Sequence, residues 1–370
     1  MGNMSKTAKF VVILLIVTIA SFAIAGLIFY EEYGKNNFAD LNGDVFKPSG
    51  SVDVDETKTG SVTGIENIYI NTPSDDINII KTDSGELKAH FHGYYSTSVA
   101  DYKPEFTLTS GGGDMRIKVE YRPVVGQLRF NSNLKLDVYL PAGYAKNLEI
   151  GTASGSVRTD GINALESFTC KTASGDLEAG PVNARTARLQ SSSGNAAITG
   201  EYGSFEFQAA SGEFRSEGIK ADSASLRTAS GNIRLKGSIG DLKLNSTSGE
   251  VLAEQLIAGT CKAETTSGSV TLKGNPGKLE ASASSGEIRL QYDEFASDIT
   301  LRTISGDAFI KLPQDAQFRL DYDTVSGDKK IDFPITINGN SKEKGVHGTV
   351  VSDRNYIKVS TTSGSLEITK

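Results

Sequence analysis

Residues 226–249 read LRTASGNIRLKGSIGDLKLNSTSG, and this stretch decides the fold because it holds two copies of one corner, Ser230-Gly231 and Ser248-Gly249. Apolar and polar residues alternate on both sides of each corner, as Leu242 and Leu244 show before the second one. Alternate residues of a β-strand face opposite sides. The pattern therefore predicts one strand that enters the corner and another that leaves it, each with one buried side.

The Ser-Gly corner recurs through most of the chain. The first ten copies of the series are 18 to 21 residues apart, and the last gap of 37 residues is about two steps. The serines of the series are Ser154, Ser174, Ser193, Ser211, Ser230, Ser248, Ser267, Ser285, Ser305, Ser326 and Ser363. A fixed period of this length is typical of a solenoid, in which stacked repeats bury an apolar side that one repeat cannot bury. Residues 145–370 are therefore predicted to form a β-solenoid of roughly eleven or twelve coils.

Three positions before each corner share one side of the strand. The residues six and four positions before the serine are mostly apolar, and the residue two positions before it is always small, as Thr228 is. We expect the apolar positions to be buried and the small hydroxyl residues to form hydrogen bonds near the corner. The glycine is expected to supply the positive φ that a tight corner often needs.

Both cysteines, Cys170 and Cys261, fall at inward positions of the repeat, five coils apart. Five strand spacings correspond to roughly 24 Å, whereas a disulfide needs Cα atoms within about 7 Å. Two free, buried thiols are therefore predicted. The rival interpretation is a disulfide of the kind that two cysteines in an exported chain suggest.

Residues 10–30 are 21 consecutive uncharged, mostly apolar positions, long enough to cross a hydrocarbon core of about 30 Å as a helix. Lys6 and Lys9 precede them, so the positive-inside bias predicts residues 1–9 in the cytoplasm and the solenoid outside the cell membrane. The alternative is a signal peptide cleaved near Ala25, although the apolar run continues beyond that residue. Residues 31–60 are polar and are predicted to form a flexible spacer.

Residues 61–144 are strand-like but lack the regular corner, apart from one early copy at Ser84-Gly85. The open end of a solenoid exposes strand edges and needs capping, so we expect longer, irregular coils that cap the stack. A separate small β-domain is the alternative. Near the other end, residues 341–348 interrupt the repeat and are expected to project as a polar hairpin, after which a last coil at 359–368 closes the stack.

Few residues are candidates for chemistry. His90 and His92 are two residues apart on a predicted strand, a spacing that can hold a metal ion, while His347 stands alone. No cysteine, aspartate or glutamate with matching alternation lies beside the pair, so both are expected to be solvated strand residues. The corner serines repeat for geometry, and no histidine lies within the regular coils. No catalytic, cofactor-binding or metal-binding residue is therefore predicted.

The position two residues after each corner serine is polar. Its members are Asp176, Glu213, Glu250, Glu287, Asp307 and Asp328, mixed with Ser156, Asn195, Asn232, Ser269 and Ser365. Stacking would align them in a ladder that could bind Ca²⁺ or supply paired carboxylates to a polysaccharide-active enzyme. Because neutral residues separate the acids, we expect a solvated turn edge instead. Gly111–Gly113 is followed by neither Lys-Ser/Thr nor a helix, which favours a hairpin turn over a phosphate loop.

Several short segments carry a likeness to a known family: TASGD at 172–176, TASGN at 228–232, TVSGD at 324–328, Leu140-Pro141, Leu312-Pro313 and the ending at 358–370. From about residue 60 onward the chain resembles the bacterial putative-adhesin family of β-strand-repeat proteins, and its membrane-anchored members resemble LiaG-type proteins encoded with envelope-stress systems. The resemblance implies the repeat fold and supplies no catalytic residue.

The composition limits the classes of binding partner that are expected. The formal net charge is −7 and there is no tryptophan, which argues against nucleic acid and anionic lipid headgroups as electrostatic partners. We expect a non-enzymatic, single-pass membrane protein whose extracytoplasmic β-solenoid is an interaction surface at the bacterial envelope, favoured as an accessory of an envelope-stress or other membrane complex. The alternative is an adhesin-like binder of a cell-wall or surface polymer, and a less favoured one is a polysaccharide-active β-helix enzyme. No cofactor is expected.

Overall fold

The computed structural model describes residues 51–99, 102–122, 130–337 and 345–370, which form strands and turns without any helix. The fold is an all-β solenoid of about nine turns. The chain divides into two compact units, one made of residues up to Gly180 with 190–194, the other of 181–189 with 195–370. Within the described part, no helix is long and apolar enough to cross a membrane, and the anchor predicted at 10–30 lies outside it.

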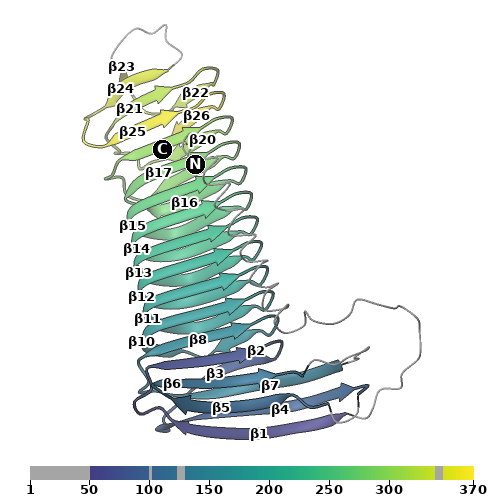
Figure 1. Ribbon diagram of the computed structural model, residues 1–370. Helices are drawn as coiled ribbons and strands as arrows, with labels where there is room; N and C mark the ends of the chain where they lie inside the picture. Colours follow the sequence, from purple (N-terminus) through teal and green to yellow (C-terminus); the bar gives the residue numbers. More distant parts are fainter. Residues whose placement is uncertain (1–50, 100–101, 123–129, 338–344) are drawn as a thin grey trace, which may run out of the picture. The chain divides into compact units, whose positions relative to one another are not determined.

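Most of the second unit consists of parallel strands stacked one above the other (Figure 1). Its regular strands are β12 (Ala196–Ala209), β13 (Phe214–Thr228), β14 (Ile233–Ser246), β15 (Val251–Thr265), β16 (Val270–Asn275), β17 (Lys278–Ala283), β18 (Ile288–Tyr292), β19 (Ile299–Thr303) and β20 (Ala308–Lys311). In register, Leu226 of β13 lies beside Leu244 of β14, which lies beside Ala263 of β15. The stacking step therefore equals the sequence repeat, as predicted.

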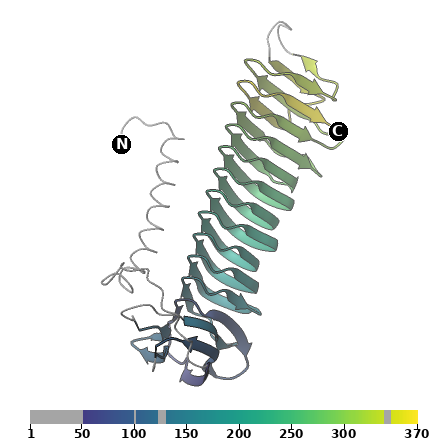
Figure 2. The same cartoon turned by 90° about the vertical axis from the view of Figure 1, so that its right-hand side faces the viewer.

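The strands of each coil in this unit form two facing layers (Figure 2), and apolar columns fill the space between them. The residues six and four positions before the corner serine are buried, as Leu242 and Leu244 are at 1% and 0% exposure. The residues three and five positions after it are buried too, as Ile233 and Leu235 are. The inward positions predicted from the period of two are thereby confirmed.

The corner glycines are required by close packing and not by their backbone angle. None of the described Ser-Gly glycines of the regular series has a positive φ, which corrects the prediction. Instead, each approaches the coil below. An ideal Cβ on Gly249 would overlap the carbonyl oxygen of Gly231 and lie 2.6 Å from its carbonyl carbon. The same overlap recurs at Gly268 and Gly286.

The hydroxyl residues before the corner face inward and bond to it, as predicted. Thr228 Oγ1 accepts a hydrogen bond from the Gly231 amide at 2.9 Å, and Ser246 Oγ accepts one from the Gly249 amide at 2.9 Å. Thr361 reverses the direction and donates to the Gly364 carbonyl at 2.8 Å. Each bond satisfies a backbone group at the corner, and the Gly364 carbonyl also accepts a hydrogen bond from the Tyr322 hydroxyl at 3.2 Å.

A second corner, which the sequence analysis did not anticipate, closes the other edge of the coil. Here the long strands bend at a register shift, and glycines with positive φ occupy the bend: Gly237 at 155° and Gly274 at 123°. In the coil between them the same bend contains Gln255, whose φ of 51° is left-handed. A non-glycine residue pays a steric penalty there.

The first unit combines short parallel coils with added antiparallel strands. Its strands are β1 (Val52–Ser61), β2 (Asn67–Thr72), β3 (Asp76–Thr82), β4 (Glu86–Thr97), β5 (Glu105–Gly111), β6 (Asp114–Glu120), β7 (Phe130–Pro141), β8 (Asn147–Thr152), β9 (Val157–Thr159), β10 (Ile162–Thr172) and the start of β11 (Leu177–Ser191). β2 lies between β6 and β8, and β3 lies between β7 and β9, all in parallel. A regular coil therefore starts at Asn67, earlier than expected from the Ser-Gly series.

Antiparallel strands cover the outer end of this unit. β5 pairs with β6 through a turn at Gly112 and Gly113, which confirms the predicted hairpin. β4 pairs with β7, and β1 pairs with β4. β1 includes residues that were expected to belong to the flexible spacer. These residues pack on the rest of the unit, since Val54 is buried and Lys58 Nζ lies 5.5 Å from the Phe106 ring centroid. The early Ser-Gly copy belongs to the exposed β3–β4 connection and is not a solenoid corner, since a Cβ on Gly85 would meet nothing within 4 Å.

Asp75 takes the place of the corner glycine in the first coil. Gly155 of the next coil packs against its carbonyl group. The Asp75 side chain is 3% exposed and accepts a hydrogen bond from the Tyr121 hydroxyl, while its Oδ2 has no partner among the described residues. Burial raises the pKa of this carboxyl group to about 6, and the Tyr121 hydrogen bond opposes the rise.

The coils at the end of the second unit do not stack in chain order. The strands concerned are β21 (Phe318–Asp323), β22 (Lys329–Ile331), β23 (Thr336–Ile337), β24 (Val346–Val350), β25 (Tyr356–Ser360) and β26 (Leu366–Thr369). β25 lies between β19 and β21, and β26 lies between β20 and β22. The expectation that residues 359–368 close the stack is therefore wrong.

The outermost coil is instead the one at 318–331, and the antiparallel pair β23–β24 continues the sheet beyond β21. This antiparallel pair brackets the segment predicted to project as a hairpin, whose residues 341–344 lie outside the described part. The structure has about nine turns, fewer than the eleven or twelve coils expected. The end coils are short and are interrupted by antiparallel strands.

Both cysteines are free and buried, as predicted. Burial raises the pKa of each thiol to about 12, so both are protonated at neutral pH. They act as small apolar core residues.

Candidate functional site

An open groove of about 320 Å³ lies on the outer face of β16, β18, β20 and β26 in the second unit. Each strand contributes two outward side chains, at the positions four and six residues after its corner serine. The register aligns them in two rows. One row is Thr271, Arg289, Phe309 and Glu367, and the other is Lys273, Gln291, Lys311 and Thr369.

An aromatic side chain with a cation on it forms the centre of the groove. Phe309 is half-buried, and the Arg289 guanidinium carbon lies 4.2 Å from its ring centroid. Arg289 also donates two hydrogen bonds to Glu287 Oε2, at 2.9 and 2.5 Å. These contacts hold the guanidinium over the Phe309 ring, where it can still offer its remaining donors to a ligand.

Among the described residues, one cation of the groove, Lys311, lacks the ion pair that neutralises the equivalent lysines of earlier coils. From Glu217 to Lys273, the charge of the residue six positions after each corner serine alternates in sign. Lys236 and Lys273 form ion pairs with the preceding carboxylates, Glu217 and Glu254, at 2.6 and 2.8 Å. The hydrogen bond from Lys273 holds the pKa of Glu254 below its usual value. After Lys273 the alternation stops, and Lys311 forms no ion pair with any residue that the structure describes.

The groove therefore combines an aromatic platform, three cations and neutral hydrogen-bonding groups, with Glu367 as its one acid, already paired with Lys330 at 2.7 Å. Such a surface suits an extended, negatively charged ligand that carries hydroxyl groups. The register of β26 beside β20 completes it, and that register could not be read from the chain order. Reading outward columns coil by coil could have found its first six residues.

The ladder two residues after each corner serine is bonded to the backbone of its neighbours. Asn195 Oδ1 accepts from the Glu213 amide at 3.0 Å, and Asn232 Oδ1 accepts from the Glu250 amide at 2.9 Å. Asp307 Oδ1 accepts from the Ser365 amide at 2.7 Å. These side chains link successive coils by hydrogen bonds along the turn edge.

The two histidines of β4 were expected to be solvated strand residues, but each has a carboxylate partner. His90 and His92 on β4 lie beside Asp137 on β7, and the three form the only group of this kind suited to a metal ion among the described residues. The expectation that no acid lies beside the pair is wrong, because Asp137 is 45 residues away in sequence and the antiparallel pairing brings it opposite His90. His347 contacts Asp321 through Nδ1 at 3.2 Å and Asp323 through Nε2 at 3.5 Å.

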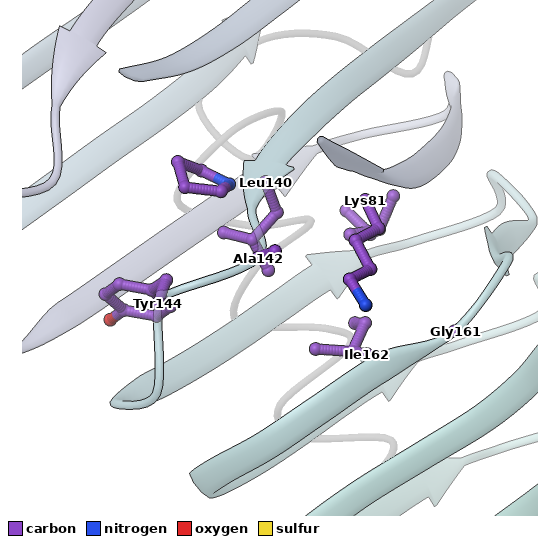
Figure 3. A pocket seen from close by; sticks show the side chains of 8 residues that line it. Lys81, Leu140, Ala142, Tyr144, Gly161 and Ile162 are labelled. Atoms are coloured by element: carbon purple, nitrogen blue, oxygen red, sulfur yellow. The ribbon is translucent and has the colours of Figure 1, made fainter. Parts of the chain in front are cut away.

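A second cavity, in the first unit, is too small for a ligand. It has a volume of about 10 Å³, and its lining includes Lys81, Leu140, Tyr144 and Ile162 (Figure 3). A cavity of this size holds at most one water molecule.

Comparisons with known proteins concern the repeat fold. Among solved structures the chain is similar to a "putative adhesin" from Parabacteroides distasonis, with 12% identity over 85% of this chain and 97% of that one and a TM-score of 0.35. It is also similar to a "putative lipid binding protein" from the same organism, with 15% identity, the same coverage and a TM-score of 0.34. A "putative cell adhesion protein" from Clostridium sporogenes shares 12% identity over 86% of this chain and 99% of that one, with a TM-score of 0.20. No curated protein matches the chain.

A family model described as Toastrack DUF4097 matches residues 65–237 and again 198–369. The two overlapping matches run from β2 to the end of β26 and confirm the expected family resemblance. The chain belongs to the Toastrack DUF4097 family.

Proposed function

We propose that this protein is a non-enzymatic interaction module of the bacterial surface, and that the groove over β16, β18, β20 and β26 binds an acidic, hydroxyl-rich polymer. The observation that carries the proposal is the pairing of Phe309 with Arg289 between Lys273 and Lys311. Successive strands are about 4.8 Å apart, so a polymer lying across them meets one row of side chains after another.

Local charge decides this binding more than net charge does. The net charge of −7 repels an anion at long range, but charges farther apart than about 8 Å are largely screened at physiological salt. Within that distance the ligand meets the cations of the groove. We therefore expect binding that weakens with salt and that depends on Lys311, whose charge no described acid neutralises.

In the same proposal, residues 10–30 anchor the chain in the cell membrane and the solenoid lies outside the cytoplasm. The 21 uncharged residues of this stretch, with Lys6 and Lys9 before them, support the anchor and its direction. This setting brings the groove to the polymers of the envelope.

The test is cosedimentation of the full-length protein with bacterial cell walls, before and after chemical removal of their anionic polymer. Lys311→Glu should weaken binding to intact walls about tenfold, which corresponds to about 1.4 kcal/mol. Phe309→Ala should weaken it as well, since it removes the aromatic platform.

The matched control is Lys243→Glu, which makes the same charge change at an exposed position of β14 outside the groove. It should bind as the unchanged protein does. Equal loss in both lysine variants, or equal binding to stripped walls, would show that the groove is not the binding site.

The second candidate is an accessory of an envelope-stress or other membrane complex. The predicted anchor followed by a short spacer favours it, because the solenoid then stays close to the membrane. Cross-linking of the tagged protein in living cells, followed by mass spectrometry, separates the two. Stoichiometric capture of specific membrane proteins supports the accessory, whereas capture of wall material alone supports the polymer binder.

A further inference from the structure

The strongest unassigned group of side chains lies on the outer face of the antiparallel strands β1, β4 and β7 in the first unit. Phe91 of β4 is 1% exposed, so its neighbours His90 and His92 both point outward. β4 lies between β1 and β7, with Asp55 of β1 opposite His92 and Asp137 of β7 opposite His90. Two imidazoles are therefore flanked by a carboxylate on each side.

The distances bring these groups into one cluster. His92 Nε2 lies 3.0 Å from Asp137 Oδ2, and the ligand atoms of His90, His92 and Asp137 all lie within 4.8 Å of one another. The two imidazole rings stack with centroids 4.4 Å apart and an angle of 22° between their planes. His90 Nε2 lies 2.8 Å from Asp55 Oδ1.

The cluster is partly shielded from solvent, and a hydrogen bond from a neighbouring strand orients one of its carboxylates. The side chains of Asp137, His90 and His92 are 16%, 27% and 32% exposed, while Asp55 is 86% exposed. Asn78 of β3 donates a hydrogen bond to Asp137 Oδ1 at 2.7 Å and leaves Oδ2 for another partner. A carboxylate that is oriented in this way by a neighbouring side chain is typical of a metal ligand.

Two imidazoles and one carboxylate are ligands suited to Zn²⁺ and to neighbouring divalent transition ions. Zn²⁺ binds imidazole nitrogen and carboxylate oxygen at about 2.0 to 2.2 Å, so its ligand atoms lie closer together than the 4.8 Å limit met here. Side-chain rotation can close that difference because the strand register already holds all three residues on one face.

We propose that His90, His92 and Asp137 bind one divalent transition-metal ion, with Zn²⁺ as the representative ion and with Asp55 or water in the fourth position. The ion would link β4 to β7, and through Asp55 also to β1. It would thereby clamp the antiparallel strands to the parallel coil formed by β3 and β7. This function is independent of the groove on the second unit.

The test uses the full-length protein purified without a histidine tag and freed of metal with a chelator. Calorimetric titration with ZnCl₂ should show saturable uptake of one ion per chain, and the ion should raise the thermal melting temperature. His92→Gln and Asp137→Asn should abolish both effects. Asn78→Ala, which removes only the support, should weaken binding by about 10- to 100-fold.

His347→Gln is the matched control, since His347 also contacts two carboxylates but has no second histidine beside it. It should bind Zn²⁺ as the unchanged protein does. Titration with Co²⁺ gives a second readout, because visible absorption of a four-coordinate ion should appear in the unchanged protein and be lost in the His92 and Asp137 variants. Circular dichroism shows whether each variant folds.

If His92→Gln disturbs folding, loss of the Co²⁺ absorption in a folded Asp137→Asn variant still supports the site. No saturable uptake by the unchanged protein would overturn the proposal. So would uptake that survives both the His92 and the Asp137 substitutions, or uptake that disappears only in His347→Gln.

Discussion

Alanine at Gly249 tests the packing reason for the corner glycines. An ideal Cβ at this position would overlap the Gly231 carbonyl oxygen, and it would lie 2.6 Å from the carbonyl carbon and 3.1 Å from Ser246 Oγ. Carbon atoms in good contact lie about 3.5 to 4.0 Å apart. The two coils would therefore have to separate by about 1 Å at the corner, because the obstacle is backbone and cannot rotate away.

The separation has a definite cost. Two ladder bonds hold these coils together beside the corner, from the Thr247 amide to the Thr228 carbonyl at 3.3 Å and from the Ser248 amide to the Ala229 carbonyl at 2.9 Å. Each buried hydrogen bond contributes about 1 kcal/mol, and overpacking a core costs about 1 to 3 kcal/mol. We expect Gly249→Ala to destabilise the protein by about 3 to 5 kcal/mol.

The matched control is Gly85→Ala, at the Ser-Gly copy where a Cβ would meet nothing within 4 Å. Stability is measured as the urea midpoint of the full-length protein in mild detergent, and hydrogen exchange follows the Ser248 amide, since repeat proteins can open locally. Gly249→Ala should lower the midpoint and speed that exchange, whereas Gly85→Ala should change neither by much. Equal midpoints for the two variants would refute the packing explanation and leave the glycine without a structural reason.

Three further substitutions test other parts of the fold. The pKa of Asp75 is raised from 3.8 to about 6, so the folded state holds its proton more tightly, and stability should fall by about 2 kcal/mol as pH rises from 4 to 7. Asp75→Asn should flatten this profile in urea titrations, and an unchanged slope would contradict it. Gln255→Gly should raise the free energy of unfolding from urea titration by about 1 kcal/mol, because it relieves the left-handed φ of 51°. Thr228→Val should cost about 1 to 3 kcal/mol by leaving the Gly231 amide unpartnered, and Thr228→Ser should restore most of it.

The features that follow from nearest neighbours could be predicted from the sequence. A residue such as Leu244 has the same surroundings in every coil, since the period places an equivalent residue above and below it. The inward columns, the hydroxyl bonds at the corners and the two buried thiols all depend on this repetition alone. The predicted reason for the corner glycine, a positive φ, was wrong. Close approach of two backbones also requires glycine, so the sequence alone does not separate the two causes.

The order of the end coils could not be predicted, for a physical reason. Ile299, Ile357 and Leu320 occupy the same inward position, and all three are branched apolar side chains of similar size. Local pattern therefore does not distinguish chain order from the exchanged order that the structure shows. Both candidate sites depended on such long-range pairing: β26 beside β20 completes the groove, and β7 beside β4 brings Asp137 to His90.

The exchanged order explains how the second unit protects its end. β26 lies between two parallel neighbours, with Ile368 beside Ile310 of β20 and Ile331 of β22. The exposed coil at 318–331 is instead continuous with chain on both sides, and its sheet is extended by the antiparallel strand β24. In the first unit the coil formed by β2 and β3 lies inside β6 and β7, which pair with the antiparallel strands β5 and β4, while β1 pairs only with β4 among the described strands. Because an extra connecting loop adds little entropic cost, exchanging the order of the coils and adding antiparallel strands covers sheet edges at little cost in stability.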